Sequence, residues 1–212
     1  MQKITEIALE KAVDGVFTRP EVTCWVGGSP NRQFQLIKRA LGAGEIERIH
    51  RGFYCLAEKY LRRKLDPLVL AQRIYGPSYI SLETALSYHG WIPEAVYAIT
   101  SVSLDRSCEF DTPLGRFSFT RVPQKTFYAE ASRVEKEVGG SFLMASPLKA
   151  LADYVYVHKC DWQSARPVIE SLRVDEGNLQ SVDSEVFDRL VGNYSSLRVR
   201  RFLEGLRKDL TK

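Results

Sequence analysis

Long apolar runs are missing from this sequence. No stretch of about 18 consecutive apolar residues occurs in the 212 residues, which argues against a helix that spans a membrane. The first residues, MQKITEIALEKAVDG, form an amphipathic pattern and lack the apolar block of a signal peptide. We therefore expect a cytoplasmic protein with no membrane partner.

Cysteine and histidine are few and scattered. The four cysteines lie about 30 to 50 residues apart without a C-x-x-C pair, and the three histidines show no metal-ligand spacing. These residues are Cys24, Cys55, Cys108 and Cys160, and His50, His89 and His158. The spacing argues against a zinc site, and a reducing cytoplasm argues against disulfides. We expect the cysteines to be packing residues and the protein to hold no metal or other cofactor.

Catalytic groupings are also missing. The sequence has no phosphate-binding glycine loop, since Gly139 and Gly140 form an isolated pair, and its spacing assembles no Ser–His–Asp or Cys–His set. Asp105, Glu109 and Asp111 come nearest to the carboxylate cluster of a metal-dependent nuclease. An acidic loop between two strands explains these three residues more simply, so we expect no enzyme activity.

The charge of the chain is unevenly distributed, although the net charge of +4 is modest. Residues 1–65 carry 12 Lys and Arg against 7 Asp and Glu, whereas residues 66–212 carry 18 against 19. A basic module attached to a nearly neutral remainder is typical of a domain that binds a polyanion. A solvated basic surface would give the same totals, so the positions of the charges have to decide between the two.

Three short helices are predicted in the basic part of the chain. They cover residues 3–13, about 19–26 and about 30–41. The first carries an apolar stripe of Ile4, Ile7, Ala8 and Val13. Thr18 followed by Glu21 has the spacing of a capping box at the start of the second helix. Ser29 followed by Pro30 predicts the start of the third, because proline at the first helical position loses no hydrogen bond.

The third predicted helix has two contrasting faces. On a wheel of about 100° per residue, the face that we expect to be buried carries Phe34, Ile37, Ala40 and Leu41. The opposite face carries Arg32, Gln35 and Arg39, flanked by Asn31 and Lys38. No acid interrupts this polar stripe, whereas an ordinary solvated helix usually includes Glu or Asp. Arg, Gln and Asn are the side chains that pair with guanine and adenine in the major groove.

Two short strands, EIERIH and GFYCL, are predicted after the third helix, with a turn at His50, Arg51 and Gly52. Gly52 suits a turn position with positive φ. Three helices followed by a two-stranded hairpin is the order of a winged helix-turn-helix. In that fold the third helix enters the major groove and the hairpin, or wing, lies along the DNA backbone or minor groove.

The predicted DNA-binding residues therefore form two groups. Those expected near base edges are Arg32, Gln35 and Arg39, with Ser29 and Asn31 at the beginning of the helix. Those expected to contact phosphates are Arg19, Lys38, Arg48, His50 and Arg51. Because winged helices also bind proteins without touching DNA, an interaction module whose wing meets an acidic partner is an alternative.

The rest of the chain predicts a larger mixed α/β domain, which makes the whole protein α+β. The charged connector KYLRRKLDPL separates a DNA-binding domain of residues 1–60 from a C-terminal domain of residues 66–212. Its expected elements are strands within 96–104 and 112–122, a strand entering a helix within 140–158, a short helix capped by Ser81, and helices in the last quarter. We interpret His89 as a helix-end residue and Asp153 as a structural polar group.

The last predicted helix combines an apolar stripe with a basic side. The stripe consists of Val199, Phe202, Leu203, Leu206 and Leu210. The basic residues are Arg198, Arg200, Arg201, Arg207 and Lys208. Three roles are open to this basic side: binding an acidic partner, adding DNA contacts, or facing solvent, and the sequence favours the last.

Four stretches in this order resemble the AbiEi family, the antitoxin and transcriptional-regulator half of type IV toxin–antitoxin (abortive infection) systems. They are RALGAGEIERIHRGFYCL, PSYISLETALSYHGWIPE, ITSVSLDR with TPLGRFSFTRV, and FLMASPLKALADY. The second stretch is the most specific. The chain departs from the family pattern at Leu148, where family members often carry an acid before the lysine, and its tail after residue 160 is only loosely similar.

The resemblance implies a function for each part. It implies a winged-helix domain that binds inverted repeats in its own promoter, and a C-terminal α/β domain that counters a nucleotidyltransferase-like toxin. The family antitoxin is not an enzyme. The rival hypothesis from a different class is a metal-dependent nuclease in which the winged helix targets a catalytic second domain.

Overall fold

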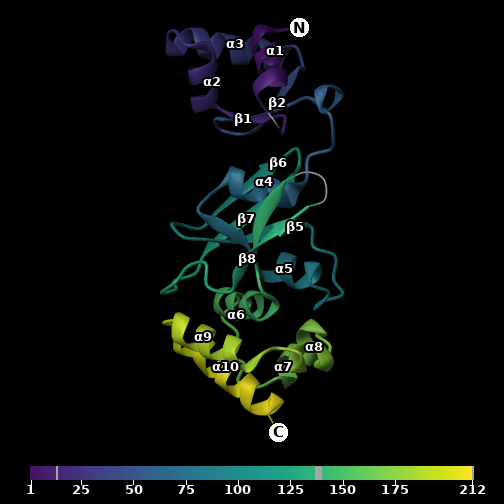
Figure 1. The fold of residues 1–212 in the computed structure, drawn as a ribbon, viewed down its shortest axis with the longest axis vertical. Helices are drawn as coiled ribbons and strands as arrows, with labels where there is room; N and C mark the ends of the chain where they lie inside the picture. Colours follow the sequence, from purple (N-terminus) through teal and green to yellow (C-terminus); the bar gives the residue numbers. More distant parts are fainter. Residues whose placement is uncertain (13, 137–139, 212) are drawn as a thin grey trace. The chain divides into compact units, whose positions relative to one another are not determined.

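The computed structural model describes residues 1–12, 14–136 and 140–211 and contains both helices and strands, as the α+β class requires (Figure 1). The chain divides into two compact units, the first made of Met1–Asp66 with Asp111–Leu114, and the second of Pro67–Phe110 with Gly115–Lys212. Val13 and Gly139, which figured in the sequence analysis, lie outside the described residues. Among the helices of the described ranges, none has the length and apolar character needed to cross a membrane.

The first unit contains three helices and a small sheet. Its elements are α1 (Lys3–Lys11), β1 (Val16–Thr18), α2 (Arg19–Val26), α3 (Pro30–Gly42), β2 (Ile46–His50), β3 (Phe53–Leu56) and a 3-10 turn, Glu58–Tyr60. The capping box at α2 is confirmed, because the backbone N–H of Glu21 donates to the Thr18 hydroxyl and that of Thr18 donates to the Glu21 carboxylate. The cap of α3 is confirmed as well, since the Ser29 hydroxyl accepts from the N–H of Arg32.

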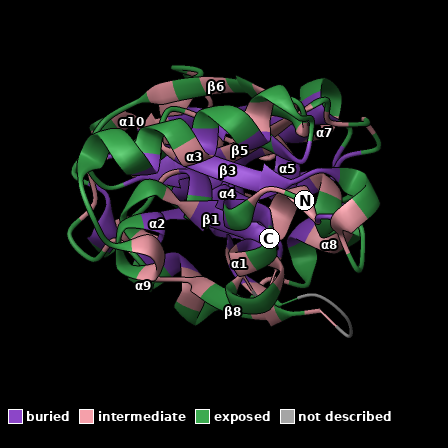
Figure 2. Cartoon of the chain, turned by 90° about the horizontal axis from the view of Figure 1, so that it is seen from above, coloured by how far each residue is buried: buried purple, intermediate pink, exposed green. Residues whose placement is uncertain are grey.

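The sheet of the first unit has the strand order β1-β3-β2, with both pairings antiparallel. β1, which is only three residues long, was not predicted from the sequence. β3 is buried along its whole length (Figure 2). Gly52 has a φ of +83° at the turn, as predicted. The pairing register shifts between Arg48 and His50. Glu47 and Arg48, which precede the shift, are both exposed.

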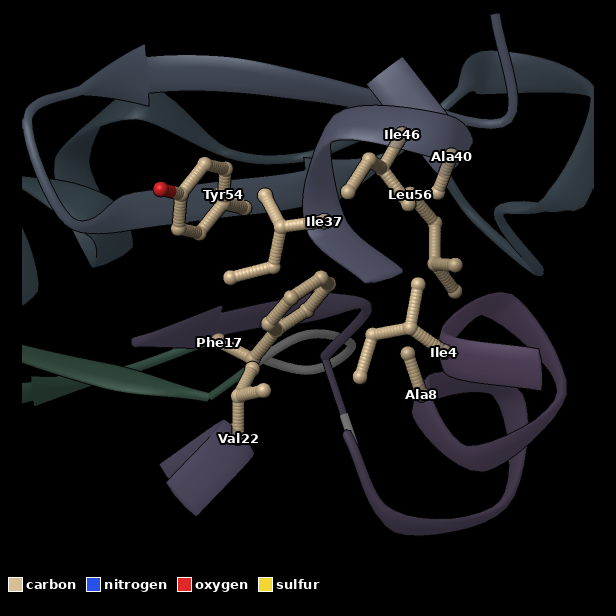
Figure 3. Packing of buried hydrophobic residues seen from close by; sticks show 9 residues of the cluster. All are labelled: Ile4, Ala8, Phe17, Val22, Ile37, Ala40, Ile46, Tyr54 and Leu56. Carbon is tan, nitrogen blue, oxygen red and sulfur yellow. The ribbon is translucent and has the colours of Figure 1, made fainter. Parts of the chain in front are cut away.

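The core of the first unit joins all three helices to the sheet (Figure 3). Its buried residues are Ile4, Ala8, Phe17, Val22, Ile37, Ala40, Ile46, Tyr54 and Leu56. The ring of Phe17, from the unforeseen strand β1, packs against the rings of Trp25 and Tyr54, with centroid distances of 5.6 and 5.8 Å. This packing fixes α2 and α3 against the sheet and so determines which face of α3 remains exposed.

The second unit is built around a six-stranded mixed sheet with the order β6-β7-β5-β4-β9-β8. Its strands are β4 (Ser78–Ile80), β5 (Ala98–Ser103), β6 (Cys108–Thr112), β7 (Gly115–Arg121), β8 (Ala131–Glu135) and β9 (Ser141–Ala145). Its helices are α4 (Pro67–Ile74), α5 (Leu82–Tyr88), α6 (Pro147–Val157), α7 (Arg166–Leu172), α8 (Glu176–Gln180), α9 (Ser184–Asn193) and α10 (Leu197–Leu210). β4 pairs antiparallel with β5 and parallel with β9, while α6 packs against both α5 and α10.

A buried carboxylate lies at the centre of the second unit. Asp153 of α6 is fully buried and accepts hydrogen bonds from the hydroxyls of Tyr79, Ser81 and Tyr194 at 2.9, 2.8 and 2.6 Å. The amide of Gln124 also donates to it, at 3.2 Å. Ser81 was expected to cap α5, but its side chain makes no cap hydrogen bond and donates to Asp153 instead.

Lys149, one turn before Asp153 on α6, is also fully buried. Its ammonium donates to the side-chain oxygen of Gln124 at 2.5 Å and lies over the rings of Tyr79 and Tyr194, at 4.8 and 5.7 Å from their centroids. Burial lowers the pKa of Lys149 and raises that of Asp153, while each charge favours the ionised form of the other. The network joins β4, α6 and Tyr194, which lies between α9 and α10.

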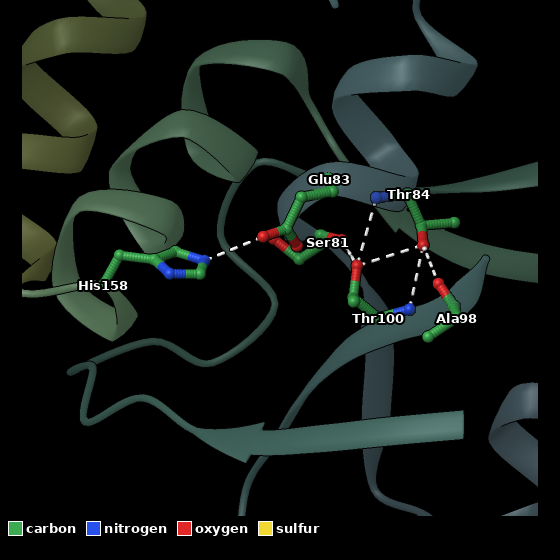
Figure 4. A network of polar contacts seen from close by, with 6 residues as sticks. All are labelled: Ser81, Glu83, Thr84, Ala98, Thr100 and His158. Atoms are coloured by element: carbon green, nitrogen blue, oxygen red, sulfur yellow. Dashed lines mark hydrogen bonds and ion pairs between the residues drawn. The ribbon is translucent and has the colours of Figure 1, made fainter. Parts of the chain in front are cut away.

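A second polar network ties α5 to β5 and α6 (Figure 4). The Thr100 hydroxyl donates to the backbone carbonyl of Ser81, and the Thr84 hydroxyl donates to that of Ala98. His158 lies 2.7 Å from Glu83. Burial alone would raise the pKa of the Glu83 carboxyl, but the hydrogen bond from His158 and other hydrogen bonds outweigh it and leave the pKa below its ordinary value. His89, also at a helix end, contacts the carbonyl oxygen of Ala145.

The apolar stripe of the last helix is confirmed, because Val199, Phe202, Leu203 and Leu206 are buried in α10. Leu210 is half-buried at its end. Many of the basic residues on this helix make intramolecular contacts. Arg198 pairs with Asp161 at 3.1 Å and Arg207 pairs with Asp188 at 2.5 Å. These contacts favour a structural and solvated role for much of the basic side.

Candidate nucleic-acid interface

The side chains that the sequence analysis assigned to DNA are mostly at the surface of the first unit. Nine of the ten are exposed: Arg19, Ser29, Asn31, Arg32, Gln35, Lys38, Arg39, Arg48 and Arg51. The tenth, His50, is half-buried, and its ring lies against Phe53 with a centroid distance of 5.4 Å. Because the His50 ring packs on Phe53, His50 exposes less of its side chain to a phosphate than the neighbouring Arg51 does.

The exposed face of α3 is rotated relative to the prediction. The buried residues of the helix are Gln33, Ile37 and Ala40, so the centre of the opposite face is formed by Asn31, Gln35 and Lys38. Phe34, which was predicted to be buried, is instead 49% exposed at one border of this face. Arg32 and Arg39 occupy the other border. The structure therefore keeps the polar, acid-free face and adds an aromatic ring to it.

Gln33 explains this rotation. Its side-chain amide donates to the backbone carbonyls of Gly27 and Gly28, both at 3.3 Å, and its oxygen accepts from the hydroxyl of Thr23 at 3.0 Å. These three bonds satisfy the polar atoms of a nearly fully buried glutamine and hold the turn between α2 and α3. A hydrophobicity wheel assigns glutamine to the exposed side, because it has no information about the carbonyl groups of the adjacent turn.

Replacing Gln33 with alanine is expected to lower the free energy of unfolding by about 1–2 kcal/mol, because the carbonyls of Gly27 and Gly28 lose their donor and the Thr23 hydroxyl keeps only the Arg19 carbonyl as acceptor. Chemical denaturation followed by circular dichroism measures this. Gln35→Ala is the matched control: Gln35 is exposed two residues further along α3, and its loss should change stability by less than about 0.5 kcal/mol. Equal effects of the two substitutions would show that the Gln33 bonds do not hold the turn.

The hairpin tip adjoins the start of α2. The backbone N–H of Arg19 donates to the carbonyl of Gly52 at 2.8 Å, and a Cβ placed on Gly52 would lie 4.0 Å from that of Arg19. Arg51, which is exposed, precedes Gly52 in the turn. The guanidinium of Arg48 lies over the ring of Tyr54, 6.0 Å from its centroid. The fold thus places Arg19, at the start of α2, next to the hairpin tip formed by residues 50–52.

Several acids of the first unit are engaged away from the exposed face of α3. Glu21 is held by Thr18 in the capping box. Glu45 is held by the backbone N–H of Gln2 at 2.7 Å, which lowers the pKa of its carboxyl. Glu47, by contrast, is exposed on β2 next to the basic residues of the hairpin. This acid reduces the positive charge on that side of the hairpin below what the basic residues alone predict.

The acidic residues considered as nuclease metal ligands, and the cysteines, do not assemble into a second site in the described part of the chain. Glu109 of the acidic segment pairs with Arg116 at 2.5 Å. Within the described ranges, no three His, Cys, Asp or Glu side chains come together as metal ligands would. Cys55 is a buried packing residue, as expected, and burial raises the pKa of its thiol to about 11. The same expectation is wrong for Cys24, which is exposed on α2.

No family model and no curated protein matches this chain. The resemblance to the AbiEi family is therefore an interpretation of the sequence motifs. Two of those motifs meet in space in the second unit, because PSYISLETALSYHGWIPE supplies Tyr79 and Ser81, and FLMASPLKALADY supplies Lys149 and Asp153. Residues of these two motifs thus form much of the buried network.

Proposed function

We propose that this protein is a DNA-binding transcriptional repressor whose first unit is a winged helix-turn-helix. In this interpretation α2 and α3 form the helix-turn-helix, β2 and β3 form the wing, and β1 is the third strand of the small sheet. The observation that supports it best is the exposed face of α3, which carries Asn31, Gln35, Lys38 and two arginines and no acid. Such a face presents donors suited to base edges and phosphates together.

We further propose that the protein acts as an AbiEi-type antitoxin, binding inverted repeats in its own promoter and countering a nucleotidyltransferase-like toxin. The four ordered sequence motifs support this proposal. In it the second unit is not an enzyme but the part that acts on the toxin. The buried network around Asp153 would then maintain the fold of that unit rather than contact a substrate, since Asp153 and Lys149 are both fully buried.

A gel shift with the DNA upstream of the protein's own coding region tests the repressor proposal. Arg51→Ala should weaken binding to all sequences alike and reduce the slope of log affinity against log salt by about one, because one phosphate contact is lost. Gln35→Ala should instead relax the preference at a single base pair, losing about 1–3 kcal/mol of discrimination. Affinities for a panel of singly substituted fragments, measured at several salt concentrations, separate the two effects.

Arg166→Ala is the control for loss of charge, because Arg166 is an exposed arginine on α7 that pairs with Glu170. It should leave affinity and salt slope unchanged. No shift of the upstream fragment by the wild-type protein would refute the repressor proposal and favour a protein-interaction module. Cutting of a plasmid in the presence of Mg²⁺ or Mn²⁺ would favour the nuclease instead. Unchanged affinity and preference in Gln35→Ala would refute the docking of α3.

A further inference from the structure

Phe34 occupies an unusual position for an aromatic side chain. It is 49% exposed, and it is the single large apolar residue in the exposed class within the described part of residues 2–66. On α3 it lies three residues after Asn31 and four before Lys38, so these two polar side chains are its neighbours on the helix surface. Exposed apolar residues are common on proteins, so the inference rests on this position and not on the exposure itself.

The neighbours of Phe34 define the chemistry of its surroundings. Asn31, Gln35 and Lys38 offer hydrogen-bond donors on the face where the ring lies, and the acid-free helix favours an anionic partner. A duplex presents one apolar group at the base edges of the major groove, the C5 methyl of thymine. A helix with polar donors beside one exposed ring therefore matches a major groove in which a thymine lies next to bases that offer hydrogen-bond acceptors.

We propose that Phe34 determines sequence specificity by packing its ring on the C5 methyl of a thymine in the operator. This inference rests on the proposed function, since it requires α3 to enter the major groove. It adds an apolar contact to the polar ones expected from Gln35 and the arginines. Phe34 would select thymine over cytosine at its position, because cytosine carries hydrogen at C5 in place of the methyl group.

Uracil-substituted DNA tests the proposal directly. Uracil pairs as thymine does and lacks only the C5 methyl group, and amplifying the upstream fragment with dUTP in place of dTTP replaces every thymine. The wild-type protein should bind the uracil fragment about fourfold more weakly for each methyl contact that is lost. Phe34→Ala should bind the thymine fragment more weakly than wild type, and its ratio of thymine to uracil affinity should be about fourfold smaller than that of wild type.

Comparing the four affinities isolates the contact, because methyl groups read by other residues affect wild type and variant alike. Tyr97→Ala is the matched control: Tyr97 is 97% exposed in the second unit, and its loss should preserve the wild-type ratio of thymine to uracil affinity. Phe34→Leu keeps an apolar side chain and should retain part of that ratio. Circular dichroism confirms that each variant is folded.

This experiment distinguishes a failure of the Phe34 proposal from a failure of the repressor proposal. If neither the wild type nor any variant binds the thymine fragment, the repressor proposal fails. If the wild type binds it but Phe34→Ala shows the same thymine-to-uracil ratio, DNA binding stands and the role of Phe34 is refuted. The same holds if the wild type binds both fragments equally. A ring that docks on a protein partner would give one of these two results.

Discussion

Replacing Asp153 with alanine is expected to destabilise the second unit by about 3–5 kcal/mol, the cost typical of removing one partner from a buried charged pair. The carboxylate accepts four hydrogen bonds inside the unit, from Tyr79, Ser81, Tyr194 and Gln124. Without it these donors stay buried with fewer acceptors. The ammonium of Lys149 also loses the negative charge that favours its ionised form.

Chemical denaturation followed by tryptophan fluorescence measures this loss. Asp161→Ala is the matched control, because the Asp161 side chain is 86% exposed in its pair with Arg198, and such a pair contributes about 1 kcal/mol at most. Lys149→Met removes the other charge at similar length and should also destabilise, since Asp153 then stays buried without its cationic partner. If Asp153→Ala were no more harmful than Asp161→Ala, the network would not stabilise the unit.

Much of the local structure followed from the sequence because the signals are local. Ser29 and Pro30 placed the start of α3 correctly, and Ser146 before Pro147 did the same for α6, where its hydroxyl accepts from the N–H of Lys149. The turn at Gly52 was predicted for the same reason. Each of these features depends on a few neighbouring residues whose conformational preferences are strong.

Features that depend on distant parts of the chain were missed. The strand β1 was not foreseen, because three residues carry too little pattern and its strand partner, β3, begins 35 residues after β1 ends. Within the Asp153 network, Tyr79 and Asp153 are bonded across 74 positions of the sequence, so spacing could suggest a buried polar group but not its partners. The burial of Gln33 in place of Phe34 likewise depends on carbonyl groups in another turn. For the candidate site, the largest difference from the prediction is that Phe34 is exposed.

Replacing Gly205 with alanine is expected to cost about 3 kcal/mol, the upper range for adding a methylene to a well-packed region. A Cβ on Gly205 would lie 1.9 Å from the carbonyl oxygen of Gln163 and 2.6 Å from its carbonyl carbon. Both atoms belong to the backbone, so no side-chain rotation can relieve the clash. The segment is also held to α10 by the N–H of Ala165, which donates to Asp209 at 3.1 Å.

Gly192→Ala separates this clash from the general effect of glycine in a helix. Gly192 lies in α9, and nothing comes within 4 Å of a Cβ placed there. Alanine is favoured over glycine in a helix by up to about 1 kcal/mol, so Gly192→Ala should raise the midpoint of chemical unfolding while Gly205→Ala lowers it. Opposite signs for the same substitution would show that the close approach of Gln163 to α10 is a packing constraint. Stabilisation by both would mean that residues 163–165 can move away from the helix at little cost.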